Sequence, residues 1–108
     1  REVIVADSHN GVLRRIDPAG TISTFSAGYL APVAVKGGPG NSVYVADAGA
    51  NAVFRVAPEG GPPRRVGRAK APGFLAVDTR HNLYVSEVAG AKRVLRIARS
   101  GRVRVLVR

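Results

Sequence analysis

This sequence of 108 residues has no cysteine, methionine or tryptophan, and its aromatic residues are limited to three tyrosines and three phenylalanines. Without cysteine, the chain can form neither a disulfide nor a thiolate metal site. Few aromatic side chains also means few platforms on which nucleic-acid bases could stack. The chain starts at Arg1 and lacks methionine, so we expect a processed product or a piece of a longer protein.

Long apolar runs are missing as well. The longest covers residues 29–35, and Pro32 interrupts it. A helix needs roughly 20 apolar residues to span a bilayer. We therefore expect no membrane insertion, and no segment has the apolar core of a signal peptide.

Acidic residues are scarce, and the shortage is uneven. The chain carries 17 lysines and arginines against seven acids, for a net charge of +10. Residues 1–63 hold five basic and five acidic residues, whereas residues 64–108 hold twelve basic residues against Asp78 and Glu87. The basic excess of the last part predicts either a polyanion-binding surface or the cut edge of a larger, better balanced protein. The preference for arginine over lysine, with abundant alanine, glycine, valine and proline, indicates a GC-rich gene and hence a bacterial source.

What the sequence does contain is an internal repeat. Three pentads start 40 residues apart and each ends in an acid: Val3–Asp7, Val43–Asp47 and Leu83–Glu87. The segment 13–20 returns at 53–60 and, one residue late, at 94–101. A period near 40 built of short strands is typical of a β-propeller blade, whereas helical repeats of this length would space their apolar residues by three and four.

Glycine, proline and asparagine divide each repeat into short runs with strand character. We label the strands A to D, from the centre of the ring outward. Copy two is expected to form them at 33–36, 42–46, 52–57 and 64–66, and copy three at 74–78, 82–86, 93–98 and 102–107. Copy one supplies only B, C and D, at 2–6, 12–16 and 21–26.

The predicted fold is therefore all-β: a β-propeller segment of four-stranded antiparallel blades with 40-residue repeats. We expect one domain over residues 1–108, with a partial blade 1 at 1–30, blade 2 at 31–70 and blade 3 at 71–108. Three blades leave two flanks uncovered. We therefore expect the segment to complete a ring, of six blades, with further blades of a parent chain or with a second copy.

Several motifs resemble the NHL repeat, in which a blade reads as a proline, an apolar strand, a Tyr-Val-Ala-Asp strand and an arginine-containing strand ending in Asp-Pro-x-Gly. They are YVAD at 44–47, LRRIDPAGTISTF at 13–25 and PVAV at 32–35. The resemblance implies a binding or interaction scaffold, comparable to the extracytoplasmic sensor propellers of bacteria. Some NHL propellers bind single-stranded RNA on a basic top face, and the related gluconolactonase-like hydrolases share parts of the pattern.

Acids and arginines recur at fixed places in the copies. Asp7, Asp47 and Glu87 each follow a strand, where a carboxylate accepts backbone N–H groups of the next turn. We therefore expect structural roles for these acids. We expect the same for the arginines that precede the last apolar residue of strand C, with pairing to an acid of a neighbouring blade: Arg15, Arg55 and Arg96.

No catalytic set emerges from the sequence. His9 and His81 lie in turns that open on opposite ends of the blades, so a shared metal site is not expected. The pair Ser8-His9 is not a triad, and no Gly-x-Ser-x-Gly elbow is present. The prediction is no catalytic residue, no metal and no cofactor.

One cluster of cations is expected. In an antiparallel blade the B–C and D–A connections lie at the same end, so Arg68 and Lys70 should approach Lys92 and Arg93. These four side chains are the candidate ligand-binding residues, for a polyanion or a protein partner. Phe25 and Tyr29 are the aromatics expected at the surface.

Three hypotheses about function remain open at this point. The first is a non-catalytic binding scaffold. The second is a propeller lyase or hydrolase whose metal site is supplied by blades outside this chain. The third is a platform for RNA or another polyanion, which without stacking partners would bind weakly and in a salt-sensitive way.

Overall fold

The computed structural model describes residues 2–88 and 92–107. The extra residue of copy three lies between Glu87 and Leu95, and residues 89–91 of this stretch are outside the described ranges. Arg1 and Arg108, the first and last residues of the expected domain, are outside them as well.

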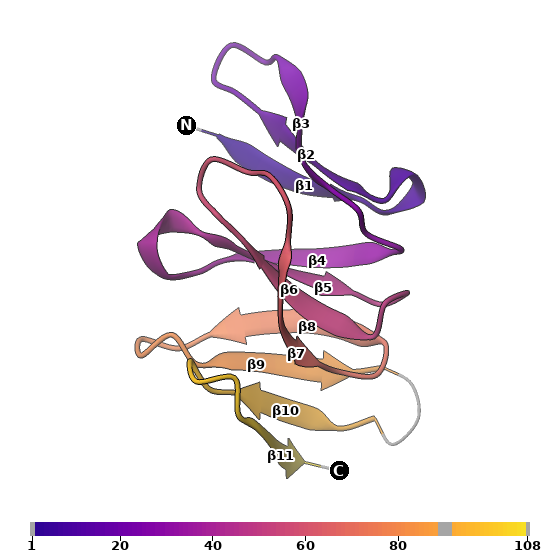
Figure 1. Cartoon of the computed structure of the whole chain (residues 1–108), viewed down its shortest axis with the longest axis vertical. Coiled ribbons are helices and arrows are strands. Elements are labelled where there is room, and N and C mark those ends of the chain that lie inside the picture. The colour runs from indigo at the N-terminus through magenta and orange to yellow at the C-terminus, as the bar shows by residue number, and fades with distance from the viewer. Residues whose placement is uncertain (1, 89–91, 108) are drawn as a thin grey trace.

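Within the described residues, eleven strands form three antiparallel sheets, which follow one another down the long axis of the molecule (Figure 1). Blade 1 contains β1 (Val3–Asp7), β2 (Val12–Ile16) and β3 (Ile22–Ala27). Blade 2 contains β4 (Pro32–Gly37), β5 (Val43–Asp47), β6 (Ala52–Val56) and β7 (Arg64–Arg68). Blade 3 contains β8 (Pro72–Val77), β9 (Leu83–Glu87), β10 (Val94–Ile97) and β11 (Val103–Val107).

The prediction of an all-β fold with four-stranded antiparallel blades is confirmed, and every expected strand is found with its ends within two residues. The pattern located them because each sheet is a simple meander, in which consecutive strands pair. Two short 3₁₀ turns were not anticipated: η1 (Ser8–Asn10) after β1 and η2 (Pro39–Asn41) before β5.

The core lies between the blades. Alternation along β5 explains this, because successive side chains of a strand point to opposite faces. Val45 packs with Leu13 of blade 1, whereas its neighbour Tyr44 packs with Leu83 and Leu95 of blade 3. Each such buried aliphatic side chain contributes roughly 1.5–3 kcal/mol, so the stacking of blades holds the segment together.

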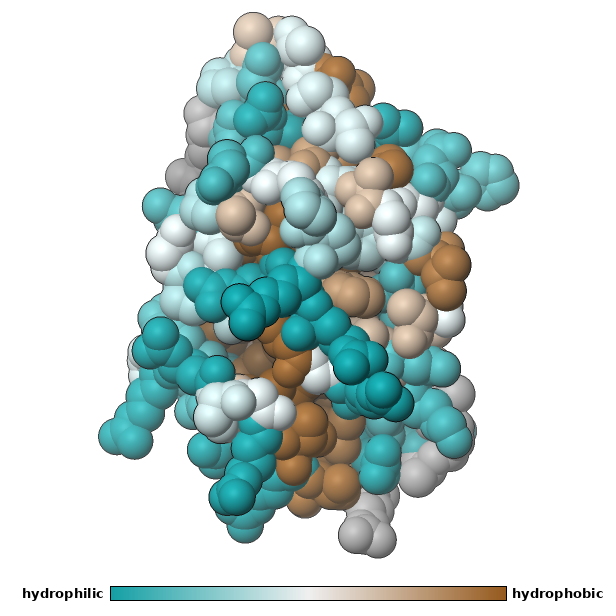
Figure 2. Space-filling view, viewed as in Figure 1, coloured by the Kyte–Doolittle hydropathy of each residue, from teal (hydrophilic) through white to brown (hydrophobic). Residues whose placement is uncertain are grey.

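The outer flanks of the stack are less covered. Ile22 of blade 1 is 65% exposed, and on blade 3 Leu106 and Val107 are also exposed. Figure 2 shows apolar side chains at the surface in the lower half of the molecule, bordered by hydrophilic ones. Exposed apolar patches of this kind mark surfaces suited to packing against another element.

In the described part of the chain, no helix has the length and apolar character needed to cross a membrane.

A candidate anion-binding groove between blades 2 and 3

The antiparallel meander brings the connections β5–β6, β7–β8 and β9–β10 to one end of the blades (Figure 1). At this end, an open groove of about 700 Å³ lies between blades 2 and 3. We call it the Glu87 groove. It is lined by residues Ala50, Asn51, Arg65, Arg68, Ala69, Lys70, Glu87 and Arg93.

Glu87 is the one acid among these lining residues, and its charge is already compensated. Arg93 Nε donates to Glu87 Oε1 at 2.7 Å, and Arg93 Nη2 donates to Oε2 at 3.2 Å. The backbone N–H of Lys70 donates to Oε2 at 2.6 Å. The Glu87 side chain is only 1% exposed, so this two-pronged pair is what makes its burial tolerable.

These contacts keep Glu87 ionised. The bond from Arg93 and the Lys70 N–H hold the pKa of the Glu87 carboxyl below its usual value, against the opposing effect of burial. The same bond raises the pKa of Arg93. Both oxygens of Glu87 accept hydrogen bonds from these donors, so the carboxylate is poorly suited to act as a general acid or base.

The remaining cations of the groove are turned to solvent. Arg65, Arg68 and Lys70 all have exposed side chains, and among the described residues the three ion pairs found involve other arginines. The lining therefore carries four positive charges and one negative charge, and the negative one is neutralised by Arg93. Such a groove attracts anions at a distance and can bind them with charge-assisted hydrogen bonds.

Asn51 fixes the backbone at the floor of the groove. It adopts a left-handed conformation, with φ of 53°, which asparagine tolerates better than most residues. Its Oδ1 accepts the N–H of Ala71 at 2.8 Å, and its carbonyl accepts the N–H of Ala69 at 3.2 Å. The connection that carries Arg68 and Lys70 is thus held against the β5–β6 turn.

Three of the four predicted site residues come together here. Arg68, Lys70 and Arg93 line the groove, whereas the exposed Lys92 is not among its lining residues. Reasoning from sequence missed Asn51 and Arg65. The signal for Asn51 was its place in the β5–β6 turn, at the same end as Arg68.

The repeated acids accept backbone donors. Asp47 accepts the N–H groups of Gly49 and Ala50 in the turn that follows it, at 3.1 Å each. It also accepts those of Leu30 and Ala31, at 2.9 and 2.8 Å, and so ties the preceding connection to β5.

Asp7 differs from Asp47, because side chains are its main partners. Asn10 Nδ2 and Arg14 Nε donate to Asp7 Oδ2 at 2.9 and 3.2 Å. The bond from Asn10, with that from Arg14, lowers the Asp7 pKa.

Arg15 and Arg55 have their partners inside their own blades, not in the neighbouring one as expected. Arg15 pairs with Glu2 at 3.6 Å within blade 1. Arg55 donates to Ser42 Oγ at 3.0 Å within blade 2, and Arg96 lies opposite Tyr84 within blade 3. The reason is register. Arg15 lies opposite Ile4 and Arg55 opposite Tyr44, so the residues two positions before these partners, Glu2 and Ser42, are diagonal neighbours within reach of a long side chain.

Other expected residues are placed as follows. His9 lies in η1 and His81 in the β8–β9 turn, at opposite ends of the blades. Among residues 2–88 and 92–107, no group of three His, Cys, Asp or Glu side chains could hold a metal ion. The expectation of surface positions for Phe25 and Tyr29 is wrong: they are 7% and 6% exposed, and Phe74 is exposed instead, at 75%.

Comparison with solved structures identifies the architecture. The chain superimposes over 99% of its length on virginiamycin B lyase from Staphylococcus aureus, with a TM-score of 0.82 at 19% identity. It matches a streptogramin B lyase equally fully, with a TM-score of 0.86 at 12% identity. A protein assigned as a gluconolactonase matches 89% of the chain, with a TM-score of 0.72 at 22% identity.

These likenesses show the fold: the chain is a segment of a β-propeller. It spans only 38%, 37% and 34% of the three matched chains, so it corresponds to little more than a third of each. No protein-family model matches the sequence, and no curated protein matches it either.

Proposed function

We propose that this chain is a non-catalytic binding segment of an NHL-type propeller and that the Glu87 groove binds a polyanionic ligand. The observation that carries the proposal is the charge of the groove. Arg65, Arg68 and Lys70 face solvent there. The one lining acid, Glu87, is ion-paired with Arg93 and accepts the Lys70 N–H. A phosphate- or carboxylate-rich ligand would supply the missing negative charge.

The resemblance of the repeats to NHL motifs supports the type of propeller and an extracytoplasmic interaction role in a bacterium. The exposed apolar flanks support completion of the ring by further blades, of a parent chain or of a second copy. The number of blades in that ring, expected to be six, stays a prediction.

Binding should depend on contacts to the anionic groups of the ligand more than on stacking of bases. Phe74 is the large aromatic side chain with substantial exposure in the described chain, and one platform cannot stack successive bases. The proposed ligand is therefore any chain of closely spaced phosphates or carboxylates, RNA included, with affinity that falls as salt rises.

The test is fluorescence anisotropy with labelled inorganic polyphosphate at several salt concentrations. We expect Arg68→Gln/Lys70→Gln to weaken binding at least tenfold and to reduce the slope of log affinity against log salt by about two. The matched control is Arg102→Gln/Arg104→Gln, which removes the same charge from the region of the outer strand β11. Equal weakening in both variants would show attraction to net charge alone and would reject the groove.

A lyase or gluconolactonase-like hydrolase is the second candidate, and the fold likeness to such proteins is the observation that favours it. In that case blades beyond these three would supply the catalytic residues. Turnover of a lactone or of virginiamycin B by the parent protein would support this candidate over the scaffold.

A further inference from the structure

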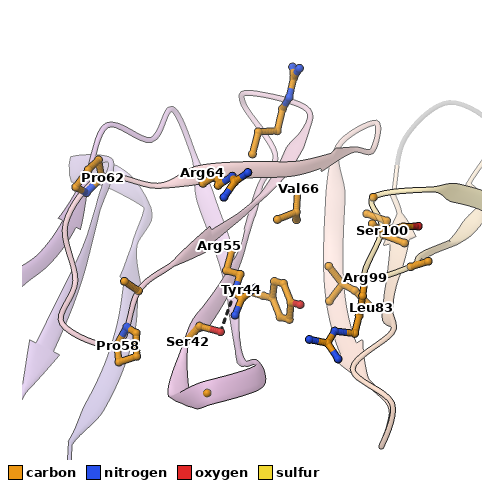
Figure 3. A pocket seen from close by; sticks show the side chains of 16 residues that line it. Ser42, Tyr44, Arg55, Pro58, Pro62, Arg64, Val66, Leu83, Arg99 and Ser100 are labelled. Atoms are coloured by element: carbon orange, nitrogen blue, oxygen red, sulfur yellow. Dashed lines mark hydrogen bonds between the residues drawn. The ribbon is translucent and has the colours of Figure 1, made fainter.

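A second groove lies at the opposite end of the same seam between blades 2 and 3, where the strands meet the β4–β5, β6–β7 and β10–β11 connections. It encloses about 610 Å³, and Figure 3 shows its lining side chains. We call it the Tyr44 groove. It shares Arg65 with the Glu87 groove but otherwise has its own residues and its own chemistry.

The base of the Tyr44 groove is apolar and firmly packed. Leu83 is 1% exposed, Ile97 is 3% exposed and Tyr44 is 6% exposed, and Val66 packs against the same cluster. In Figure 3 the Tyr44 ring lies between Arg55 and Leu83. Its phenol group offers a donor beside an apolar surface, an arrangement in which tyrosine hydroxyls usually find a partner.

Arginines surround this apolar base. Arg55 and Arg64 lie directly opposite each other in the β6–β7 ladder, and Arg99 comes from the β10–β11 turn of blade 3. Like charges directly opposite in a sheet are destabilising, so an anion placed between them is favoured. No Asp or Glu is among the residues that line the groove.

Arg55 is held in place for such a contact. Its Nε donates to Ser42 Oγ at 3.0 Å and its Nη2 to the Pro39 carbonyl at 3.3 Å. Ser42 is 4% exposed and itself donates to the Pro39 carbonyl at 2.6 Å. A guanidinium fixed in this way loses little conformational entropy when it binds an anion.

At the equivalent place between blades 1 and 2, hydrogen bonds close the seam. The Tyr44 groove lacks these hydrogen bonds. In the closed seam, Gly61 N–H donates to the Phe25 carbonyl at 2.9 Å, and Ser26 Oγ donates to the Gly61 carbonyl at 2.6 Å. The backbone of Gly60 is also pressed against the Phe25 carbonyl. These contacts draw the β6–β7 loop down onto β3.

Between blades 2 and 3 these inter-blade hydrogen bonds are missing among the described residues. Val66 stands where blade 1 has Ser26, and Arg102 stands where blade 2 has Gly61. A Cβ built on Gly101 would lie 3.9 Å from the Val66 carbonyl, and the Arg102 N–H bonds Ser100 Oγ at 3.4 Å instead of a neighbouring blade. The β10–β11 turn is therefore not bonded to β7, and the seam between blades 2 and 3 stays open.

We propose that the Tyr44 groove is a binding site for a small organic anion, one carboxylate or phosphate group on a compact apolar body. The anionic group lies between Arg55 and Arg64, with Arg99 closing the rim. The apolar body rests on Val66, Leu83 and Ile97, and the Tyr44 hydroxyl donates to a polar substituent. The Glu87 groove has no such apolar base, so the two sites select different ligands.

Calorimetric titration of the full chain with phenyl phosphate and with benzoate tests the proposal. We expect saturable binding of at least one of them, at least tenfold tighter than that of inorganic phosphate or benzyl alcohol, each of which carries half of the recognised chemistry. Binding of phenyl phosphate but not benzoate would identify the anion as a phosphate, and the reverse as a carboxylate. No binding of either probe, or equal binding of inorganic phosphate, would overturn the proposal.

Two variants locate the site. Arg64→Gln should weaken binding of the tighter-binding probe at least fivefold, because the substitution removes an exposed charge at the rim without changing the core. Val66→Ser/Arg102→Gly introduces the residues that close the seam between blades 1 and 2. This variant should weaken binding of the same probe at least tenfold while the chain stays folded. Unchanged affinity in both variants would overturn the assignment.

The matched control is Arg68→Gln/Lys70→Gln in the Glu87 groove, which should leave probe binding unchanged. Loss of probe binding in this control would place the probe in the Glu87 groove and reject the second site. This arm separates the present proposal from the proposed function.

Discussion

Glu87 and Arg93 form an ion pair across the β9–β10 turn, with two hydrogen bonds of 2.7 and 3.2 Å, in which the acid is buried and the base is about a third exposed. The corresponding positions of the other two copies hold Ala52 and Val12 in place of Arg93. The pair is therefore a feature of the third blade alone, at the edge of the Glu87 groove.

The first prediction concerns this pair. Arg93→Met should lower the free energy of unfolding by about 2 kcal/mol, because it leaves a buried carboxylate with one backbone donor; Arg93 is partly solvated, so the cost stays below that of a fully buried pair. Glu87→Gln/Arg93→Met should recover most of the loss. Arg14→Met, which breaks the more exposed pair with Asp7, should cost under about 1 kcal/mol. Urea denaturation measures all three, and equal costs for Arg93→Met and Arg14→Met would contradict the role of burial.

The second prediction concerns pH. The backbone N–H of Asn82 and further bonds from Asn82, Tyr84 and Arg80 lower the pKa of Asp78 from 3.8 to about 2. A lowered folded pKa stabilises the fold above the ordinary value, and the stabilisation is lost as pH falls through the folded value. We therefore expect the Tm to decline between about pH 4 and pH 2.

Two variants test this cause. Asp78→Asn should show a shallower decline in that interval, since it has no carboxyl to protonate. In Tyr84→Phe the decline should be smaller in total and should level off at a higher pH, because the loss of one donor to the carboxylate brings the folded pKa closer to the ordinary value. The same decline in all three proteins would contradict the assignment to Asp78.

The third prediction compares two equivalent glycines. Gly20 and Gly60 have φ of 87° and 90°, which disfavours any side chain, but only Gly60 also abuts the Phe25 carbonyl. Gly20→Ala should cost about 1 kcal/mol from backbone strain. Gly60→Ala should cost about 2–3 kcal/mol, because it also disrupts the Gly61 and Ser26 hydrogen bonds that join blades 1 and 2. Thermal unfolding of the two variants measures the difference in stability. Equal destabilisation would show that the Gly61 and Ser26 hydrogen bonds do not stabilise the seam.

The fourth prediction concerns the flanks. Ile22 and Val107 are 65% and 56% exposed on blades 1 and 3, so the chain should associate as its concentration rises. Ile22→Lys/Val107→Lys should weaken this association at least tenfold, as measured by light scattering. Thr21→Lys/Thr79→Lys adds the same charge at exposed polar positions and should have a smaller effect. A monomer at every concentration would contradict completion of the ring by a second copy and would favour completion by further blades of a parent chain.

Much of the fold could be read from the sequence, because the 40-residue period fixes which strands pair. The cation cluster could be predicted in part for the same reason, since topology alone brings Arg68 and Lys70 to the β9–β10 turn. What the sequence could not show is how one blade packs on the next. Tyr29 is buried because its hydroxyl donates to Ser26 at 2.7 Å and its ring packs edge-on against Phe54, contacts that no local pattern reveals.

The two grooves show the same limit. Arg65 lies on the strand expected to be the outermost of blade 2, and its position between two blades depends on their spacing. The Tyr44 groove arises from Val66 and Arg102, substitutions that look neutral until they are set beside Ser26 and Gly61 in the closed seam. Internal repeats thus make the departures of a single copy interpretable once one seam is seen closed and the next open.

The most direct test of the proposed function is to map polyphosphate binding on the full chain by ¹⁵N–¹H NMR titration. The account predicts that the largest shifts fall on the backbone amides of Asn51, Arg68 and Lys70, with little change at Arg102 and Arg104. Shifts spread evenly over the basic residues, or concentrated on β11, would contradict a binding site in the Glu87 groove.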